Sequence, residues 1–260
     1  MLQQVCAAVK AAGEIILSAH YSGDGMTKSG DRNYVTEYDV RVQNTLQKAL
    51  AEIAPDVSFC GEESDAQTVG KKMWIVDPID GTSNFIHDLR SSAISVALAD
   101  SEENAVELAV IYNPYFDEMF AAERGKGATC NGVPIHVSDH DYPHALIGFG
   151  TTPYDRALAH ATFEMVEAAY IESLDMRRSG SAAIDLAHIA MGRIDGFFEF
   201  RLQPWDYAAG ALLITEAGGI ISRFDGQPLD LLRPSSVLTG NPQVYADLMR
   251  TAEPYRTLVY

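Results

Sequence analysis

The segment Trp74–Phe85 reads WIVDPIDGTSNF and joins a short apolar run to two aspartates three residues apart. The apolar run predicts a buried strand, and Asp77 follows at its carboxyl end, where α/β proteins place their sites. Pro78 has no backbone N–H and cannot continue the hydrogen-bond ladder of a sheet, so Asp80 projects from a turn close to Asp77. Two carboxylates this close repel each other unless a cation lies between them. The segment therefore predicts a metal site.

The next two residues indicate a place for an anion. Gly81 permits close approach of the backbone to a ligand, and Thr82 offers a hydroxyl at a predicted helix start, where free N–H groups attract phosphate. An Asx turn with solvated aspartates would explain either aspartate alone. Six constrained residues in a row favour a binding site instead.

Two more carboxylates have a similar context. Glu62, in the GEES segment 61–64, follows the strand-like run VSFC, and Asp206, in the PWDYAAG segment 204–210, stands at a predicted helix start. As an N-cap, Asp206 would stabilise that helix by about 1 kcal/mol, and both roles are compatible. A site built from oxygen ligands alone selects Mg²⁺ or Mn²⁺ over Zn²⁺.

These segments, in this order, resemble the inositol monophosphatase family of lithium-sensitive, magnesium-dependent phosphomonoesterases. Two further segments share the resemblance, KSGDRNYVTEYD at 28–39 and RRSGSAAIDLA at 177–187. The first points to Lys28, Thr36 and Asp39, although Thr36 and Asp39 also match a helix capping box. The resemblance extends from about Lys28 to past Gly219, and several motifs in one order carry far more weight than a single one.

The resemblance implies a set of site residues. Two or three Mg²⁺ ions, for which Mn²⁺ can substitute and with which Li⁺ interferes, are expected on Glu62, Asp77, the Ile79 carbonyl, Asp80 and Asp206. Glu62, Thr82 and Asp39 are expected to orient and activate a water, without a covalent phosphoenzyme. The substrate is expected to contact Ile79, Asp80, Gly81, Thr82, Arg177, Gly180, Ser181, Ala182, Glu199 and Asp206.

Several activities fit these motifs. The stretch DGTSNFIHDL favours the inositol monophosphatase branch and hydrolysis of inositol 1-phosphate or a similar phosphorylated polyol. Within the family, a 3′,5′-bisphosphonucleotide, fructose 1,6-bisphosphate, histidinol phosphate or NADP are alternative substrates, and a member can also regulate by binding protein. A haloacid-dehalogenase-type phosphatase is disfavoured, because it needs Asp-x-Asp and the gap here is one residue longer.

Composition restricts the partners. The formal net charge of −17 disfavours nucleic acid and anionic lipid as partners. No apolar run reaches the length of about 18 residues that a membrane span needs, and the three scattered cysteines fit a reducing compartment. We therefore expect a cytoplasmic protein without a membrane segment, and the family resemblance adds a homodimer.

The expected fold is α/β, with the layered αβαβα sandwich that the family resemblance implies. Residues 1–140 predict an α+β domain, in which two helices cover one side of an antiparallel sheet and which carries most metal ligands. Residues 141–260 alternate strands with helices and predict an α/β domain that carries the substrate contacts and Asp206.

Overall fold

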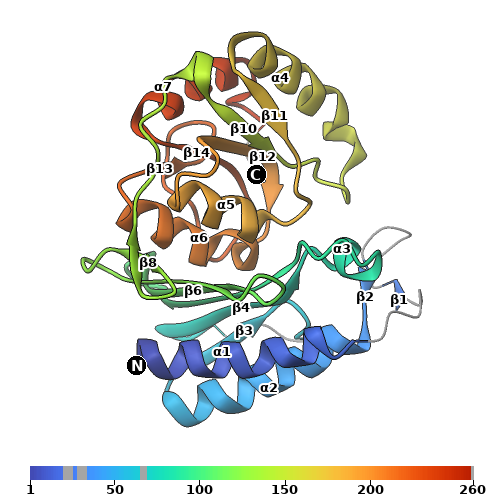
Figure 1. The fold of residues 1–260 in the computed structure, drawn as a ribbon, viewed down its shortest axis with the longest axis vertical. Coiled ribbons are helices and arrows are strands. Elements are labelled where there is room, and N and C mark those ends of the chain that lie inside the picture. Colours follow the sequence, from blue (N-terminus) through green and yellow to red (C-terminus); the bar gives the residue numbers. More distant parts are fainter. Residues whose placement is uncertain (20–25, 28–33, 65–68, 259–260) are drawn as a thin grey trace.

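The computed structural model describes residues 1–19, 26–27, 34–64 and 69–258, so the predicted site residue Lys28 lies outside the described residues. Its elements form five layers in the order helices, sheet, helices, sheet, helices (Figure 1). The predicted αβαβα sandwich is therefore confirmed.

The first two layers come from the amino-terminal part of the chain. Helices α1 (Leu2–Leu17) and α2 (Glu37–Ile53) pack side by side and present apolar stripes to one face of a seven-stranded sheet. The sheet is antiparallel except for its first pair, which is parallel. Its strands are neighbours in chain order: β3 (Ser58–Gly61), β4 (Lys72–Asp80), β5 (Ala93–Asp100), β6 (Ala105–Asn113), β7 (Glu118–Glu123), β8 (Ala128–Cys130) and β9 (Val133–Ile135).

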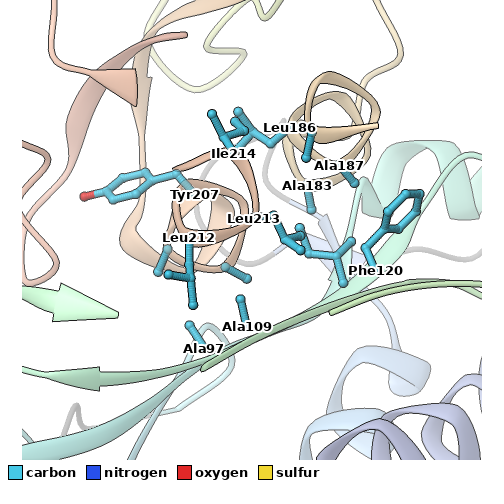
Figure 2. Packing of buried hydrophobic residues seen from close by; sticks show 14 of the residues in the cluster. Ala97, Ala109, Phe120, Ala183, Leu186, Ala187, Tyr207, Leu212, Leu213 and Ile214 are labelled. Carbon is cyan, nitrogen blue, oxygen red and sulfur yellow. The ribbon is translucent and has the colours of Figure 1, made fainter. Parts of the chain in front are cut away.

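Helices cover both faces of this sheet, as the αβαβα sandwich requires, and the two helices expected from residues 1–140 cover one of them. Along β4, Trp74 and Val76 belong to the core beneath α1 and α2, whereas Met73 and Ile75 belong to the core on the opposite face. That opposite face is covered by α5 (Ala182–Ala190) and α6 (Pro204–Glu216). Figure 2 shows Leu212 and Leu213 against Ala97, Ala109 and Phe120 of the sheet. Alanines on the strands leave room for the α6 side chains.

The middle layer is mostly buried and apolar because it lies between two sheets. The second sheet has the order β11 (Asp175–Arg177), β10 (Leu146–Phe149), β12 (Gly196–Leu202), β14 (Ser235–Gly240) and β13 (Ile220–Ser222). β10 is parallel to both its neighbours, and β14 is antiparallel to both of its own. Helices α4 (Ala159–Glu172) and α7 (Pro242–Ala252) pack on its outer face and close the sandwich (Figure 1).

The remaining elements are short. β1 (Met26–Thr27) and β2 (Tyr34–Val35) form a small antiparallel pair, and α3 (Thr82–Ile86) directly follows Gly81 at the end of β4. In the part of the chain that the structure describes, no helix combines the length and apolar character needed to cross a bilayer. The division into domains at residue 140 stays a prediction.

Candidate active site

A cavity of about 500 Å³ opens at the carboxyl end of β4. Its lining comes from two distant parts of the chain. The amino-terminal part contributes the ends of β3 and β4 and the start of α3, and the later part contributes α5, β12 and α6. The predicted residues that line it are Glu62, Asp77, Ile79, Asp80, Gly81, Thr82, Gly180, Ser181, Ala182, Glu199 and Asp206.

The end of β4 explains how both of its aspartates reach the cavity. Asp77 pairs with Ser95 and Asp80 with Ala93, and the register shifts between these two pairs. Pro78 therefore interrupts the ladder as predicted, but as a bulge within the strand and not at the end of it. The Ile79 N–H donates to Asp77 Oδ1 at 3.0 Å and holds the bulge in an Asx turn.

Three carboxylates converge in the cavity. One oxygen each from Asp77, Asp80 and Asp206 lies within 4.8 Å of the other two. Burial, followed by the nearby charge of Glu62, raises the pKa of Asp77 well above its ordinary value. Burial and the charge of Asp80 do the same for Asp206. Repulsion among hard oxygen ligands is relieved when a divalent cation lies among them, so this donor set fits Mg²⁺ or Mn²⁺.

Asp206 reaches this cluster from the first turn of α6. The helix begins at Pro204 with Gln203 as its N-cap, so the prediction of Asp206 as the N-cap was wrong. Asp206 lies three residues after the cap, and its Oδ2 accepts the Gln203 N–H at 2.7 Å. The helix begins at Pro204, two residues before Asp206, because proline suits the first helical position. Its fixed φ matches the helix, and its missing N–H is not needed there.

Asp80 is held from the opposite side by the start of α5. Its Oδ2 accepts hydrogen bonds from the Ser181 hydroxyl at 2.5 Å and from the Ala183 N–H at 2.7 Å. Burial raises the pKa of Asp80 to about 6, and these two bonds with one from Gly81 oppose that rise. Ser181 is also the N-cap of α5, because its side chain accepts the Ile184 N–H.

Glu62 follows β3 and lines the same cavity beside the three aspartates. Its backbone N–H donates to the Val76 carbonyl at 3.0 Å, which aligns it with the end of β4. The neighbouring Glu63 N–H donates to Gln43 Oε1 of α2 at 2.9 Å. The segment after β3 is thus anchored on both sides, and the Glu62 charge contributes to the raised pKa of Asp77 and Asp206.

Thr82 and Asp39 lie next to this cluster. The Thr82 hydroxyl is 3.3 Å from Asp39 Oδ1 and 3.1 Å from the Ile79 carbonyl oxygen, so its one proton can be donated to either. Burial raises the pKa of Asp39 to about 6. The predicted capping box is confirmed, because Thr36 caps α2 and Asp39 accepts the Thr36 N–H at 2.7 Å. Asp39 thereby joins the helix start to the cavity wall.

The model of the inositol monophosphatase family matches residues 1–256. The chain belongs to the inositol monophosphatase family. It is therefore a phosphoric monoester hydrolase, and the resemblance that the motifs indicate is confirmed over nearly the whole chain.

The relatives of this inositol monophosphatase family protein include proteins named SuhB and proteins named inositol monophosphatase. Nus factor SuhB of Escherichia coli K12 is 36% identical over 249 residues, which cover 94% of this chain and 92% of that protein. The crystal structure of extragenic suppressor protein suhB from Bartonella henselae is 31% identical, with a TM-score of 0.89 over 96% of this chain and 97% of that one. SaIMPase-II of Staphylococcus aureus with bound inositol monophosphate is 26% identical, with a TM-score of 0.83 over 99% and 97%.

One residue that was predicted to contact the substrate lies outside the cavity of this inositol monophosphatase family protein. Arg177 is exposed, is paired with Asp175, and is not among the described residues that line the cavity. Its neighbour Arg178 lines the cavity and donates to Thr151 Oγ1 at 3.2 Å. Arg177 is the last residue of β11 and pairs with Gly148, whereas Arg178 follows the strand and is the arginine that lines the cavity.

Glu199 is buried in β12 and reaches the cavity from the second sheet. Its Oε1 accepts the Thr152 N–H at 2.7 Å, and burial raises its pKa to about 7. Thr152 itself is buried with φ of 43°, a left-handed conformation that is rare for threonine. Glu199 therefore also fixes the segment after β10, which sequence reasoning did not predict.

A further carboxylate of the cavity escaped the sequence analysis. Asp185 of α5 is buried, accepts a hydrogen bond from the Ser179 hydroxyl at 2.7 Å, and has its pKa raised by burial to about 8. Its spacing of four residues from the N-cap Ser181 places both on one helix face. That spacing could have identified Asp185 as a residue of the cavity.

Proposed function

We propose that this protein hydrolyses a small phosphate monoester in a magnesium-dependent reaction, with inositol 1-phosphate as the leading substrate. The observation that carries the proposal is the convergence of Asp77, Asp80 and Asp206 within 4.8 Å in the cavity. Glu62 and the Ile79 carbonyl complete a ligand set for two or three Mg²⁺ ions, for which Mn²⁺ can substitute. When bound, such cations neutralise the phosphoryl oxygens and lower the pKa of the attacking water.

The protein's own groups have three tasks in this scheme. Glu62 orients the attacking water, together with Thr82, whose hydroxyl Asp39 holds in place through their 3.3 Å contact. The Gly81 and Thr82 amides bind the phosphate at the start of α3. Because Asp39 is buried and fixed by the α2 capping box, it cannot turn away from Thr82 without breaking the helix start.

The reaction needs no covalent intermediate with the protein. Water adds to phosphorus in line with the bond to the polyol oxygen, and that bond breaks with both electrons going to oxygen. The departing oxygen takes a proton from solvent, and a proton of the attacking water is released. The products are the free polyol and inorganic phosphate.

The walls of the cavity favour a polyol as the alcohol part. Glu199 and the segment Gly180–Ala182 offer a carboxylate and backbone groups that can bind hydroxyls. Arg178 stands at the place where Arg177 was predicted and adds a positive charge to the substrate side. Bound inositol monophosphate in SaIMPase-II, whose fold aligns over nearly the whole chain, supports the same class of substrate.

Phosphate release tests the proposal directly. We would measure release from inositol 1-phosphate with Mg²⁺ present and after chelation, beside a 3′,5′-bisphosphonucleotide, fructose 1,6-bisphosphate, histidinol phosphate and NADP. Magnesium-dependent release that is fastest from inositol 1-phosphate is the expected result. Faster release from another compound would reassign the substrate, and no release from any of them would contradict the proposed function.

A second, regulatory role is favoured by the relatives named Nus factor SuhB. In this role a surface of the protein binds another protein, independently of the cavity. Capture of the same partner by wild type and by Asp77→Asn would support it. Loss of capture in the variant would tie the interaction to the cavity instead.

Assembly, inhibition and location are further parts of this proposal. We expect a homodimer, inhibition of turnover by Li⁺, and a cytoplasmic location, which the free cysteines Cys6, Cys60 and Cys130 support. Light scattering of the purified protein and a Li⁺ titration of phosphate release test the first two.

A further inference from the structure

Asn84 lies between three segments that meet beside the cavity. It belongs to α3, two residues after Thr82, and its side chain is buried. Its Nδ2 donates to the Ser91 carbonyl at 2.6 Å and to the Ser179 carbonyl at 2.9 Å. Both amide hydrogens are used, so the two carbonyls fix the orientation of the side chain.

The hydrogen bond from Asn84 to the Ser179 carbonyl fixes the segment whose Ser181 hydroxyl binds Asp80. Ser181, two residues further on, donates to Asp80 Oδ2 at 2.5 Å. Between them Gly180 has φ of 86°, and a Cβ there would lie 3.0 Å from Asn84 Oδ1. Asn84 therefore packs directly against the backbone that carries Ser181.

The third segment is the turn at Gly81. A Cβ on Gly81 would lie 3.1 Å from the Ser91 carbonyl oxygen and 3.2 Å from that of Gly180. The phosphate-binding turn thus packs against the same two segments that the Asn84 side chain joins. A shift of either segment would open space beside Gly81.

The loop that follows α3 is strained. Asp88 and Arg90 have φ of 49° and 54°, in the left-handed region that residues other than glycine rarely adopt. The Asn84 carbonyl accepts the Leu89 N–H between them at 2.9 Å, and its side chain binds Ser91 beyond them. Such strain persists where surrounding contacts determine the conformation, and it is typical of functional sites.

We propose that Asn84 is a positioning residue, which locks the segment Ser179–Ser181 onto the Gly81 turn and so aims the Asp80 carboxylate at the metal. The proposal rests on the proposed function for its catalytic consequence. Asn84 is one of the residues that line the cavity, but both hydrogens of its amide nitrogen go to backbone carbonyls. In this proposal it therefore acts on the metal through Ser181 and Asp80. Its effect on metal binding can be measured without turnover.

The test is Asn84→Asp, which keeps the size of the side chain and removes both N–H donors when ionised. The matched control is Asn104→Asp. Asn104 also joins distant parts of the chain, since its Nδ2 donates to the Leu229 carbonyl at 2.8 Å and its Oδ1 accepts the Leu231 N–H at 3.0 Å. Asn104 does not line the cavity. We would measure Mn²⁺ affinity by calorimetry, kcat and KM for phosphate release, and Tm.

Asn84→Asp should weaken Mn²⁺ binding and lower kcat by about 10-fold each, as loss of support behind a metal ligand does. KM should change less than kcat, because the polyol contacts remain. Asn104→Asp should lower Tm while leaving Mn²⁺ affinity and kcat at wild-type values. Asn84→Ser, which keeps one donor and adds no buried charge, should fall between wild type and Asn84→Asp.

Wild-type Mn²⁺ affinity in Asn84→Ser and in any folded Asn84→Asp would overturn the proposal, even if both lower Tm. Should Asn84→Asp fail to fold, Asn84→Ser decides alone. If wild type releases phosphate from no substrate, the proposed function fails, and the comparison of Mn²⁺ affinities still tests the role of Asn84. A wild-type protein that binds no Mn²⁺ contradicts both proposals.

Discussion

At Asp77, burial and the charges of neighbouring carboxylates both disfavour the ionised side chain. It is almost completely buried, and the charges of Glu62, Asp80, Asp206 and Asp39 all raise its pKa further. An ionised carboxylate in this position destabilises the metal-free fold, but the same negative charge allows the site to bind a cation.

Asp77→Asn should therefore separate stability from function. Removing the charge should raise the free energy of unfolding of the metal-free protein by roughly 1–3 kcal/mol, while magnesium-dependent turnover falls by at least about 10²-fold. Thermal unfolding in chelator and phosphate release in Mg²⁺ measure the two effects. The control is Asp195→Asn, a buried aspartate outside the cavity that accepts the Leu146 N–H, which should lower Tm and spare turnover. Near-normal turnover in Asp77→Asn would refute the assignment of Asp77.

The sequence predicted single residues well where strand ends and turns place them. Asp77, Asp80 and Glu62 each come just after an apolar run in the sequence, so local pattern alone places them near one edge of a sheet, although Asp77 and Asp80 lie within β4. Arg177 is the last residue of β11 and Arg178 follows it, and which of the two lines the cavity depends on where the pairing of β11 with β10 ends. That pairing joins segments far apart in the chain, and no local pattern reports it.

Among the elements, α5 has the closest connection to the chemistry. Its first turn supplies the Ser181 hydroxyl and the Ala183 N–H to Asp80, and the same hydroxyl oxygen caps the helix by accepting the Ile184 N–H at 3.3 Å. A helix amino terminus is favourable for a carboxylate, because its N–H groups are unpaired and its dipole is positive there. One side chain thus serves both the helix and the metal site.

Ser181→Ala should show both losses. The missing cap should destabilise the protein by about 1 kcal/mol, and the missing donor to Asp80 should raise the Mg²⁺ concentration needed for half-maximal turnover by about 10-fold. Asn241→Ala is the control, because Asn241 caps α7 by accepting the Gln243 and Val244 N–H groups and lies outside the cavity. It should be destabilised with an unchanged Mg²⁺ requirement. An equal Mg²⁺ requirement in Ser181→Ala and wild type would contradict this role.

The sequence predicted the existence of some helices better than their boundaries or the sheet faces that they cover. The two helices expected to cover one side of the first sheet are α1 and α2, which are amphipathic because one face packs on the sheet and the other meets water. The αβαβα sandwich implied helices on the second face of the first sheet, but which helices cover it could not be read locally, since α5 and α6 come from beyond residue 180. The start of α6 was placed too late, because the apolar pattern begins after Pro204.

For the molecule as a whole, buried acids should make metal-free stability depend on pH. The pKa is raised to about 6 for Asp80, to about 7 for Glu199 and to about 8 for Asp185, in each case chiefly by burial. In the unfolded chain these groups titrate near pH 4. Between the two ranges the folded protein holds more protons than the unfolded chain, so stability falls as pH rises.

In chelator, Tm should be lower at about pH 8.5 than at about pH 5.5 by roughly 5 °C or more. The net charge of −17 also lowers stability as pH rises. Adding Mg²⁺ distinguishes the contribution of the cavity carboxylates from that of the remaining charges. Adding Mg²⁺ at the higher pH should recover most of the loss in wild type and little of it in Asp77→Asn. Differential scanning calorimetry measures this, and a Tm that rises with pH in chelator would rule out the explanation.

The proposed division at residue 140 has its own consequence. A fragment of residues 1–140 contains the whole first sheet with α1 and α2, but it lacks α5 and α6. The face with Ala97, Ala109 and Phe120 would then meet water, and exposed apolar surface of this size promotes aggregation. We expect the fragment to bind a hydrophobic dye and to self-associate in gel filtration. A monomeric fragment that unfolds cooperatively would instead show an independent domain.

The order in which the chain leaves the ribosome matters for the same reason. The first sheet is complete at Ile135, whereas the helices that cover its second face begin at Ala182. During that interval of synthesis the nascent chain carries a finished sheet with one bare apolar face, which is the kind of surface that chaperones bind. Asp206 emerges later still, so the three aspartates can first share a cation only when most of the protein has been made.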